Sequence, residues 1–422
     1  SRTMATAFTV LFVFFLLLMC GLKFWLATRQ IRHVARHAQA VPPQFAGRVS
    51  LEAHRKAAAY TIDRQRLSML DTAAGVALLV VLTLLGGVQA LAAAIGGWLG
   101  SGLAAQVTIV AAVAVILAMV DLPFEWYRQF RIEAKFGFNR MTARLFVADM
   151  FKSALVAAAL GLPLLTLVLW LMDAAGSYWW LYAWAVWVGF NALVLLLYPT
   201  VIAPLFNRFE PLADGDLAAR IGALLDRTGF SSRGVFVMDG SRRSAHGNAY
   251  FTGLGRAKRI VFFDTLLQRL QPPEIEAVLA HELGHFKRRH IAKRLVFSFA
   301  SSLVFLAALG WLAGARWFYQ GLGVTPPLDG AHNGVALVLF MLVAPVFTFV
   351  LAPIASRISR RHEFEADAFA VAHTCGDDLA SALVKLYEDN AATLTPDPLH
   401  SAFYDSHPPA AARIARLQSA AA

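Results

Sequence analysis

The sequence predicts a polytopic α-helical membrane protein with seven transmembrane helices and a small α+β domain built from two discontinuous polar segments. The first observation is composition: 58% of the 422 residues are hydrophobic and only 15% are charged, whereas a soluble domain is about 25% charged. The others are a series of seven apolar stretches and two long polar segments, 206–295 and 356–422. This composition excludes a disordered chain, a nucleic-acid-binding tail protein and a simple soluble enzyme.

The apolar stretches reach or exceed the length of about 20 residues that an α-helix needs to cross a bilayer. The first stretch is too long for a cleavable signal peptide, and no small-residue cleavage site precedes the basic segment after it. The seven predicted spans are residues 5–27, 73–93, 103–122, 153–172, 178–205, 296–315 and 335–355.

Basic residues in the connecting loops predict how the spans are oriented. Eight lysines and arginines lie between residues 28 and 70, whereas the loops 94–102, 173–177 and 318–334 contain none. Because positive residues stay on the cytoplasmic side, the N-terminus is expected outside, and both polar segments and the C-terminus inside. The net charge of +11 is therefore assigned to membrane-flanking loops, and no nucleic-acid partner is expected.

The spans divide the chain into four parts. An N-terminal membrane region with five spans covers 1–205, and spans six and seven cover 296–355. Between and after them lie the first and second parts of one polar domain, at 206–295 and 356–422, which are expected to meet on the same side of the membrane.

The first polar segment has a mixed helix and strand pattern. The expected strands are Val235–Met238, Asn248–Thr252 and Arg259–Phe263, and a glycine-bearing turn at 253–255 joins the last two. A helix is expected over Asp216–Arg227, stopped by Gly229, and a second begins at Pro272 and is expected to run to about Arg294.

The second of these helices carries the sequence His281-Glu282-Leu283-Gly284-His285. Residues four apart lie on one helical face, so the two imidazoles can bind one Zn²⁺ ion through nitrogen. Glu282, one position round the helix, can take a proton from a metal-bound water. The alternative is a surface helix with two incidental histidines.

Zinc in a catalytic site needs a third protein ligand and one open position. In the second polar segment, Glu363 and Asp367 are four apart and share a helical face, whereas Glu365 points about 200° away from Glu363. Spacing alone leaves the third ligand open between Glu363 and its rivals His290, His362, Glu365 and His373.

The segment His407-Pro408-Pro409 precedes a helix expected over Ala410–Leu417, which contains Arg413. Together His407 and Arg413 could stabilise the oxyanion of a tetrahedral intermediate. The alternative is a capping histidine and an exposed arginine.

Together these motifs make the chain resemble the zinc-dependent CAAX prenyl proteases, integral-membrane metallopeptidases with the shorter heat-shock protease HtpX as a distant relative. The resemblance covers most of the chain. It rests on Phe136–Asn139 with Thr142, Asn248–Phe251, Arg259–Val261, Asp264–Leu267, His281–His285, Glu363–Asp367, and His407–Pro409 with Arg413.

The resemblance implies one Zn²⁺ per chain held by His281, His285 and Glu363, with Glu282 as the general base. It implies that Asp367 holds a ligand or donates a proton, and that His407 and Arg413 assist catalysis. Asn248, with Ala249 and Tyr250 beside it, would contact the substrate backbone. It also implies seven helices around an intramembrane chamber, capped by a protease domain of the zincin type.

The expected partners are the lipid bilayer and membrane-associated peptides or proteins, some of them carrying a prenyl group. No endoplasmic-reticulum retrieval signal is found at Gln418–Ala422, so a bacterial plasma membrane is the expected location. The sequence leaves the oligomeric state open.

Three alternatives remain. The first is an HtpX-like quality-control protease without prenyl dependence. The second is a site-2-type protease that cuts within the bilayer, for which Leu328–Gly330 would be the second motif; the basic residues Lys287–Arg289 after the zinc helix oppose it. The third is a seven-span receptor or scaffold with a structural zinc site, which would need no general base.

Overall fold

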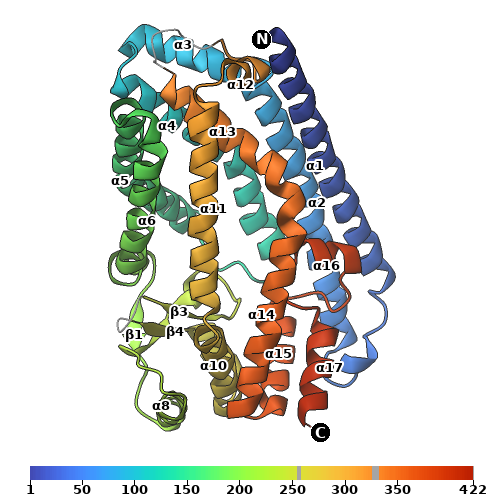
Figure 1. The fold of residues 1–422 in the computed structure, drawn as a ribbon. Helices are drawn as coiled ribbons and strands as arrows, with labels where there is room; N and C mark the ends of the chain where they lie inside the picture. Colours follow the sequence, from blue (N-terminus) through green and yellow to red (C-terminus); the bar gives the residue numbers. More distant parts are fainter. Residues whose placement is uncertain (254–257, 326–331, 422) are drawn as a thin grey trace.

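This computed structural model describes residues 1–253, 258–325 and 332–421. Helices run the length of the molecule, and a small sheet lies at the end opposite the N-terminus (Figure 1). Within the described residues, seven helices are long and apolar enough to cross a membrane. The predicted fold class is confirmed.

The membrane part consists of long helices that extend beyond the predicted spans because their polar ends continue as helix outside the apolar region. Five of them precede the sheet, and α11 and α13 follow it. The bounds are α1 (Arg2–Arg36), α2 (Leu51–Leu82), α3 (Gly87–Leu99), α4 (Leu103–Tyr127), which continues as the π-helix η2 (Arg128–Glu133), α5 (Ala143–Ala174), α6 (Trp179–Leu197), α7 (Ala203–Phe206), α11 (His290–Leu312), α12 (Arg316–Gly321) and α13 (Asn333–Thr348).

The predicted position of the second span, 73–93, is wrong. The crossing helix is α2, which begins at Leu51 and ends at Leu82, and the shorter α3 follows from Gly87. Gly86 has a φ of 81°, a left-handed conformation that glycine adopts without steric cost. A hydropathy window registers only the apolar run and not this break in the helix.

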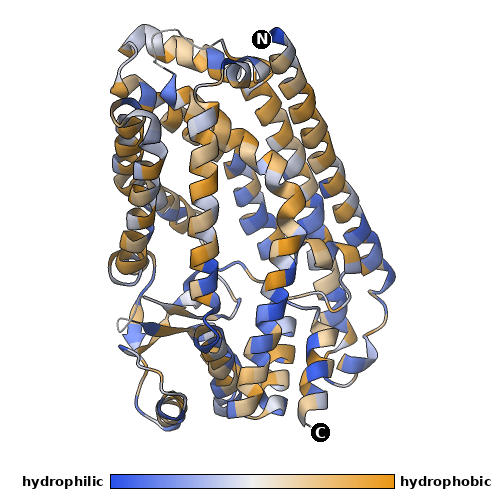
Figure 2. Ribbon diagram, in the orientation of Figure 1, coloured by the Kyte–Doolittle hydropathy of each residue, from blue (hydrophilic) through white to orange (hydrophobic). Residues whose placement is uncertain are grey.

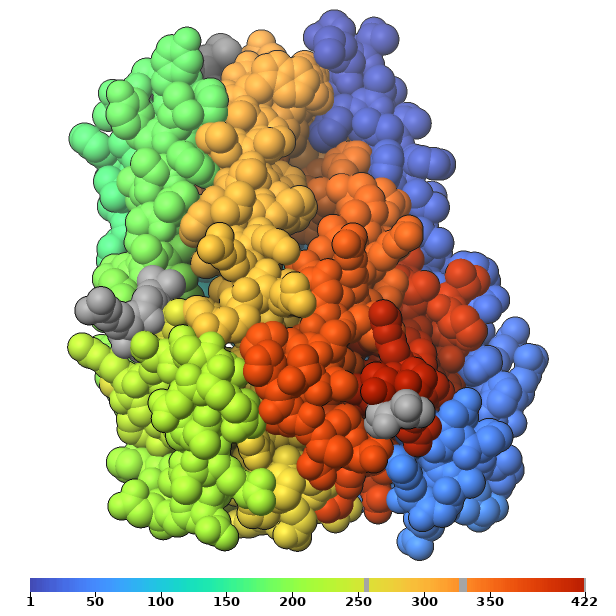
Figure 3. All heavy atoms as spheres, turned by 60° about the horizontal axis from the view of Figure 1, so that its bottom comes forward, coloured from blue at the N-terminus to red at the C-terminus, as the bar shows by residue number. Residues whose placement is uncertain are grey.

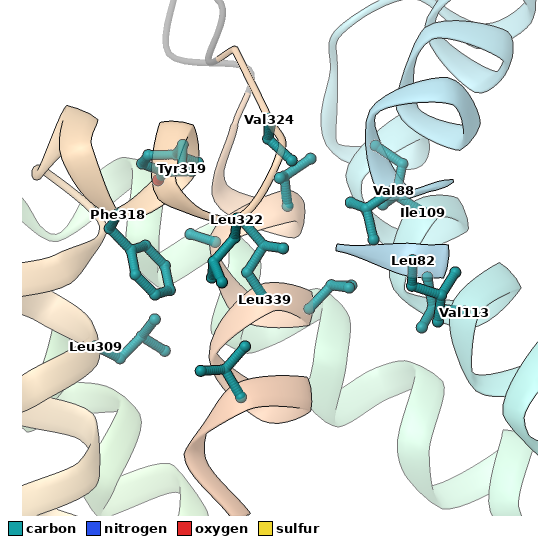
Figure 4. Packing of buried hydrophobic residues seen from close by; sticks show 14 of the residues in the cluster. Leu82, Val88, Ile109, Val113, Leu309, Phe318, Tyr319, Leu322, Val324 and Leu339 are labelled. Atoms are coloured by element: carbon teal, nitrogen blue, oxygen red, sulfur yellow. The ribbon is translucent and has the colours of Figure 1, made fainter. Parts of the chain in front are cut away.

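The membrane helices pack around one apolar core. It contains Leu82 and Val88 from α2 and α3, Ile109 from α4, and Leu339 from α13. Figure 4 shows Leu309, Phe318 and Leu322 on the other side of Leu339, so that α13 lies between two groups of apolar side chains. Burial on both sides fixes the position of α13, and therefore the position of the helix that continues from it.

The polar domain contains the sheet and the remaining helices. Hydrophilic residues gather at this end of the molecule, whereas hydrophobic residues cover most of the helical bundle (Figure 2). The bounds are β1 (Phe209–Pro211), α8 (Asp216–Thr228), β2 (Val235–Met238), β3 (Ala249–Thr252), β4 (Arg259–Phe263), α9 (Asp264–Arg269), α10 (Pro272–Lys287), α14 (Ala352–His373), α15 (Gly376–Asp389), α16 (Pro398–Tyr404) and α17 (Ala410–Ala421).

The strand order is β1-β2-β4-β3, with β2 and β4 parallel and the outer pairs antiparallel. The three predicted strands are confirmed, although β3 begins at Ala249 rather than Asn248. Of the predicted turn at 253–255, only Gly253 lies within the described residues, with a φ of 94°.

A second apolar core joins the two polar segments. Ile260, Ile275 and Leu279 from the first segment pack with Leu379 and Ile414 from the second. The corresponding surfaces lie side by side at the lower end of the molecule in Figure 3. The domain is therefore formed by two discontinuous segments, as the sequence predicts.

The helix that begins at Pro272 ends earlier than predicted. α10 stops at Lys287, and α11 begins at His290 instead of continuing the same helix to Arg294. Arg289 adopts a φ of 57°, a left-handed conformation that is uncommon for residues other than glycine. This turn at Arg289 directs the chain from the polar domain into the sixth span.

Candidate metal centre

α10 presents the two histidines of the His-Glu-x-x-His sequence from a buried position. Pro272 occupies the first turn, where its missing N–H costs nothing, and the backbone N–H of Gln271 donates to the Glu274 carboxylate at 2.9 Å. The helix packs against α14, and His281 and His285 lie in this interface.

Glu363 on α14 meets both histidines. Its carboxylate oxygens lie 3.3 Å from His281 Nε2 and 3.1 Å from His285 Nε2, and the two Nε2 atoms are 3.2 Å apart. One ligand atom from each of the three residues falls within 4.8 Å of the others. Three side chains from two helices therefore converge on one point.

The donor set fits a metal ion of the zinc type. Two imidazole nitrogens and one carboxylate oxygen make three protein ligands, as in catalytic zinc sites with an open fourth position. Glu363 Oε2 is buried and has no hydrogen-bond partner among the described residues, which would be costly without a ligand to satisfy it. Of the candidates for the third ligand, the structure brings only Glu363 to this point.

Asp367 lies directly behind His281. Its Oδ1 is 2.7 Å from His281 Nδ1, and Arg413 makes two 2.7 Å hydrogen bonds to the same carboxylate. Burial alone would lower the pKa of His281, but hydrogen bonds to Asp367 and Glu363 outweigh it and raise that pKa to about 9. An N–H at Nδ1 that donates to Asp367 leaves the Nε2 lone pair free for a metal.

A longer chain of hydrogen bonds lies behind His285. His285 Nδ1 is 3.0 Å from His290 Nδ1, and His290 Nε2 is 2.8 Å from Glu365 Oε2. If each ring donates toward Glu365, His285 Nε2 is again left free. His362 stacks on His290 with ring centroids 4.0 Å apart. His290, His362 and Glu365, three of the rivals for the third ligand, thus lie behind the candidate ligand His285, and no sequence pattern indicates this arrangement.

Glu282 lies beside the three candidate ligand residues and is partly buried. Burial raises the pKa of its carboxyl, and the nearby His281 and His285 act in the opposite direction. A carboxylate with a raised pKa, next to the point where the ligands converge, can accept a proton from water and release it again.

His407 reaches the same point from the loop before α17. Its Nε2 lies 3.6 Å from Glu363 Oε2, and its side chain is exposed. Arg413, by contrast, is buried and held by Asp367. The structure therefore brings both side chains to the site: His407 from its exposed side, and Arg413 from its buried side, where Arg413 Nη2 also lies 3.6 Å from Glu363 Oε2.

Asn248 and the strand after it lie at the edge of the sheet. β3 pairs with β4 alone among the described strands and packs beside α10. Asn248 is exposed, and its carbonyl accepts from Phe263 N at 3.0 Å. Ala249 and Tyr250 are half-buried on the strand, whose outer edge is left unpaired within the described residues.

Sequence comparison agrees with the class of protein that this geometry defines, a metallopeptidase embedded in a membrane. A family described as CAAX prenyl protease N-terminal, five membrane helices, matches residues 30–208, and peptidase family M48 matches residues 211–421. The chain therefore belongs to peptidase family M48.

Its similarity to individual proteins covers nearly the whole chain. A CAAX prenyl protease 1 homolog of Oryza sativa is 33% identical, with 96% of each chain covered. The human CAAX prenyl protease 1 homolog is 30% identical over 94% of this chain and 92% of its own. The crystal structure of S. mikatae Ste24p superposes with a TM-score of 0.91 at 30% identity, covering 97% of this chain and 99% of that one.

Proposed function

We propose that this membrane metallopeptidase is a zinc endopeptidase that cleaves CAAX-type substrates, which end in a cysteine, two aliphatic residues and one variable residue. The observation that carries the proposal is the convergence of His281, His285 and Glu363 beside Glu282. The substrate class is supported by the relatives, which are named CAAX prenyl proteases.

Zinc held by His281, His285 and Glu363 would act as a Lewis acid and lower the pKa of a bound water toward about 7. Glu282 takes a proton from the water that attacks the scissile carbonyl. Its raised pKa favours the next step, in which it gives this proton to the leaving amine.

The surrounding side chains position these groups. Asp367 holds His281 in the tautomer with Nδ1 protonated, and Arg413 in turn keeps Asp367 ionised and oriented. His407, on the open side, donates to the oxygen that becomes negative on the scissile carbonyl. Arg413 would act mainly through Asp367, to which it makes both of its 2.7 Å hydrogen bonds.

The peptide substrate would bind as a further strand on the outer edge of β3. An unpaired strand edge offers backbone hydrogen bonds that do not depend on side-chain identity. Asn248, Ala249 and Tyr250 would supply this edge, and the packing of β3 beside α10 supports a position close to Glu282.

We further propose that the sheet end lies at the cytoplasmic face of a bacterial plasma membrane, as the loop charges favour. Peptidase segments 206–295 and 356–422 would then form one cytoplasmic catalytic domain, attached to spans in 1–205 and 296–355. An attached prenyl chain would lie among the membrane helices, where each buried CH₂ contributes about 0.8 kcal/mol.

The test compares kcat/KM for one CAAX peptide with and without a farnesyl group, in detergent micelles at fixed concentration. Both forms should be cleaved, the unlipidated one at higher KM, since the groups near Glu282 contact only the peptide. If the unlipidated form is not cleaved at any concentration, the lipid is part of recognition. If farnesylation has no effect, the HtpX-like alternative is favoured.

The matched variants are Glu282→Gln and Glu276→Gln, two glutamates of α10. Glu282→Gln should retain metal and lose about 10³-fold in cleavage. Glu276 forms surface ion pairs with Arg220 and Arg227, so its substitution should leave cleavage unchanged. Cleavage by Glu282→Gln above about a tenth of wild type would show that another group is the base.

A further inference from the structure

A cavity of about 650 Å³ adjoins the metal centre, within the size range of ligand sites. His407, Pro408 and Tyr387 line the side nearest the site. The opposite side comes from α2 and the start of η2, including Arg64, Gln65, Ser68 and Arg128. The cavity thus leads from His407 to two cationic side chains.

The guanidinium N–H donors of Arg64 and Arg128 are available to a ligand. In the described parts of the chain, no carboxylate lies within 4.0 Å of either guanidinium, although Asp71 and Asp405 line the same cavity. Arg64 stacks over the Tyr60 ring at 5.4 Å. The carboxylate of nearby Glu133 accepts from the Tyr60 hydroxyl and lies 3.0 Å from His246 Nε2, so it is already engaged.

Arg64 lies on the polar part of α2, before the apolar stretch of this helix, and Arg128 follows the end of α4. Both residues are exposed and line the cavity, so their charges are accessible to a ligand in it. A guanidinium presents a planar fork of donors that matches a carboxylate. The cavity is therefore suited to an anion with this geometry.

We propose that Arg64 and Arg128 bind the free C-terminal carboxylate of the substrate. The inference rests on the proposed function, because a CAAX peptide has its carboxylate three residues beyond the bond to be cut. Three extended residues span about 10 Å. A peptide held on β3 with its scissile carbonyl near His407 would then direct its last residues into the cavity.

This subsite would explain selection for the end of a chain. A segment from the middle of a protein offers the same backbone to β3 but no carboxylate for the arginines. The arginines would therefore favour cleavage near a free C-terminus, whichever aliphatic side chains precede it.

The experiment measures kcat/KM for one farnesylated CAAX peptide as the free acid and as the C-terminal amide. The enzymes are the full-length wild type, Arg64→Gln, Arg128→Gln and, as a matched control, Arg66→Gln. Arg66 lies on the same helix but is absent from the cavity wall and is 4.0 Å from Asp63.

Wild type and Arg66→Gln should prefer the acid by about tenfold or more, and the acid-to-amide ratio should fall toward 1 in Arg64→Gln and Arg128→Gln. A wild-type ratio near 1, or an unchanged ratio in both cavity variants, would overturn the proposal. Because the wild-type ratio needs no mutation, a variant that fails to fold does not obscure the result. If wild type cleaves neither peptide, the proposed function fails instead.

Two additions to this assay, inorganic phosphate and vesicles of anionic lipid, test whether the arginines bind a different anion. If the arginines select a peptide carboxylate, neither addition removes the preference for the acid at physiological concentration. Loss of the preference with anionic vesicles alone would assign the cavity to a lipid headgroup and overturn the proposal.

Discussion

Replacing Gly284 by alanine should separate the two helices that carry the metal ligands. A Cβ atom at this position would lie 2.9 Å from Ala366 Cα, 3.0 Å from Ala366 O and 3.0 Å from Phe369 Cβ. The first two are backbone atoms of α14, so no side chain can rotate away to make room.

The size of the displacement follows from these distances. Non-bonded carbon atoms prefer about 3.5–4.0 Å, so α10 and α14 must separate by about 0.6 Å or more at this point. Metal–ligand distances tolerate about 0.2 Å. His281 and His285 would move relative to Glu363, and we expect at least about tenfold weaker metal binding and about 10²-fold slower cleavage.

Stability should fall as well, by about 1–3 kcal/mol, the usual cost of overpacking. Metal affinity is measured by competition with a chelator, and unfolding by thermal denaturation in detergent. Gly222→Ala is the control, because a Cβ on this helical glycine of α8 meets no atom within 4 Å. Wild-type metal affinity and activity in Gly284→Ala would refute this account of the helix interface.

Three further predictions concern the ligands and the topology. Metal content per chain should fall sharply in His281→Ala, His285→Ala and Glu363→Ala; a Glu363→Ala protein with full metal would exclude Glu363 as a ligand. His290→Ala should weaken metal binding about tenfold, measured by the same chelator competition, because His285 loses its hydrogen-bonding partner. His373→Ala is the control, since the His373 ring bonds to the carbonyl and stacks on the ring of Phe369 on its own helix; equal affinities would contradict the chain to Glu365. Single cysteines in a background without Cys20 and Cys375 should react from outside the cell near residue 97 and only after permeabilisation near residue 230, and external labelling near 230 would reverse the orientation.

The seven spans and three of the four strands in the described sheet could be predicted because their sequence signals are local, whereas the short strand β1 is missed. Long apolar runs predict spans, and short runs of strand-forming residues near turn residues predict β2, β3 and β4, whose bounds the structure matches to within a residue. The errors occur where local signals conflict with backbone geometry. Gly86 breaks a continuous apolar run, and Arg289 adopts a left-handed φ in a segment without glycine or proline.

The site residues, too, were predictable only where the sequence signal is local. His281, Glu282 and His285 are recognisable because four-residue spacing places side chains on one face of a helix. The partners of these residues come from α14 and α17, and no local pattern states which carboxylate faces which ring. That Asp367 contacts His281 while Glu365 contacts His290 depends on the rotation of α14 against α10, which only tertiary packing sets.

The division of the catalytic domain by two spans has a consequence for how the enzyme is made. His281 and His285 leave the ribosome before α11 and α13, and Glu363 follows only after both. The three residues can therefore meet only once this hairpin has entered the bilayer and returned the chain to the same side. A nascent chain that has not been inserted would lack Glu363 at this point, so the proposed metal site would be complete only after membrane integration.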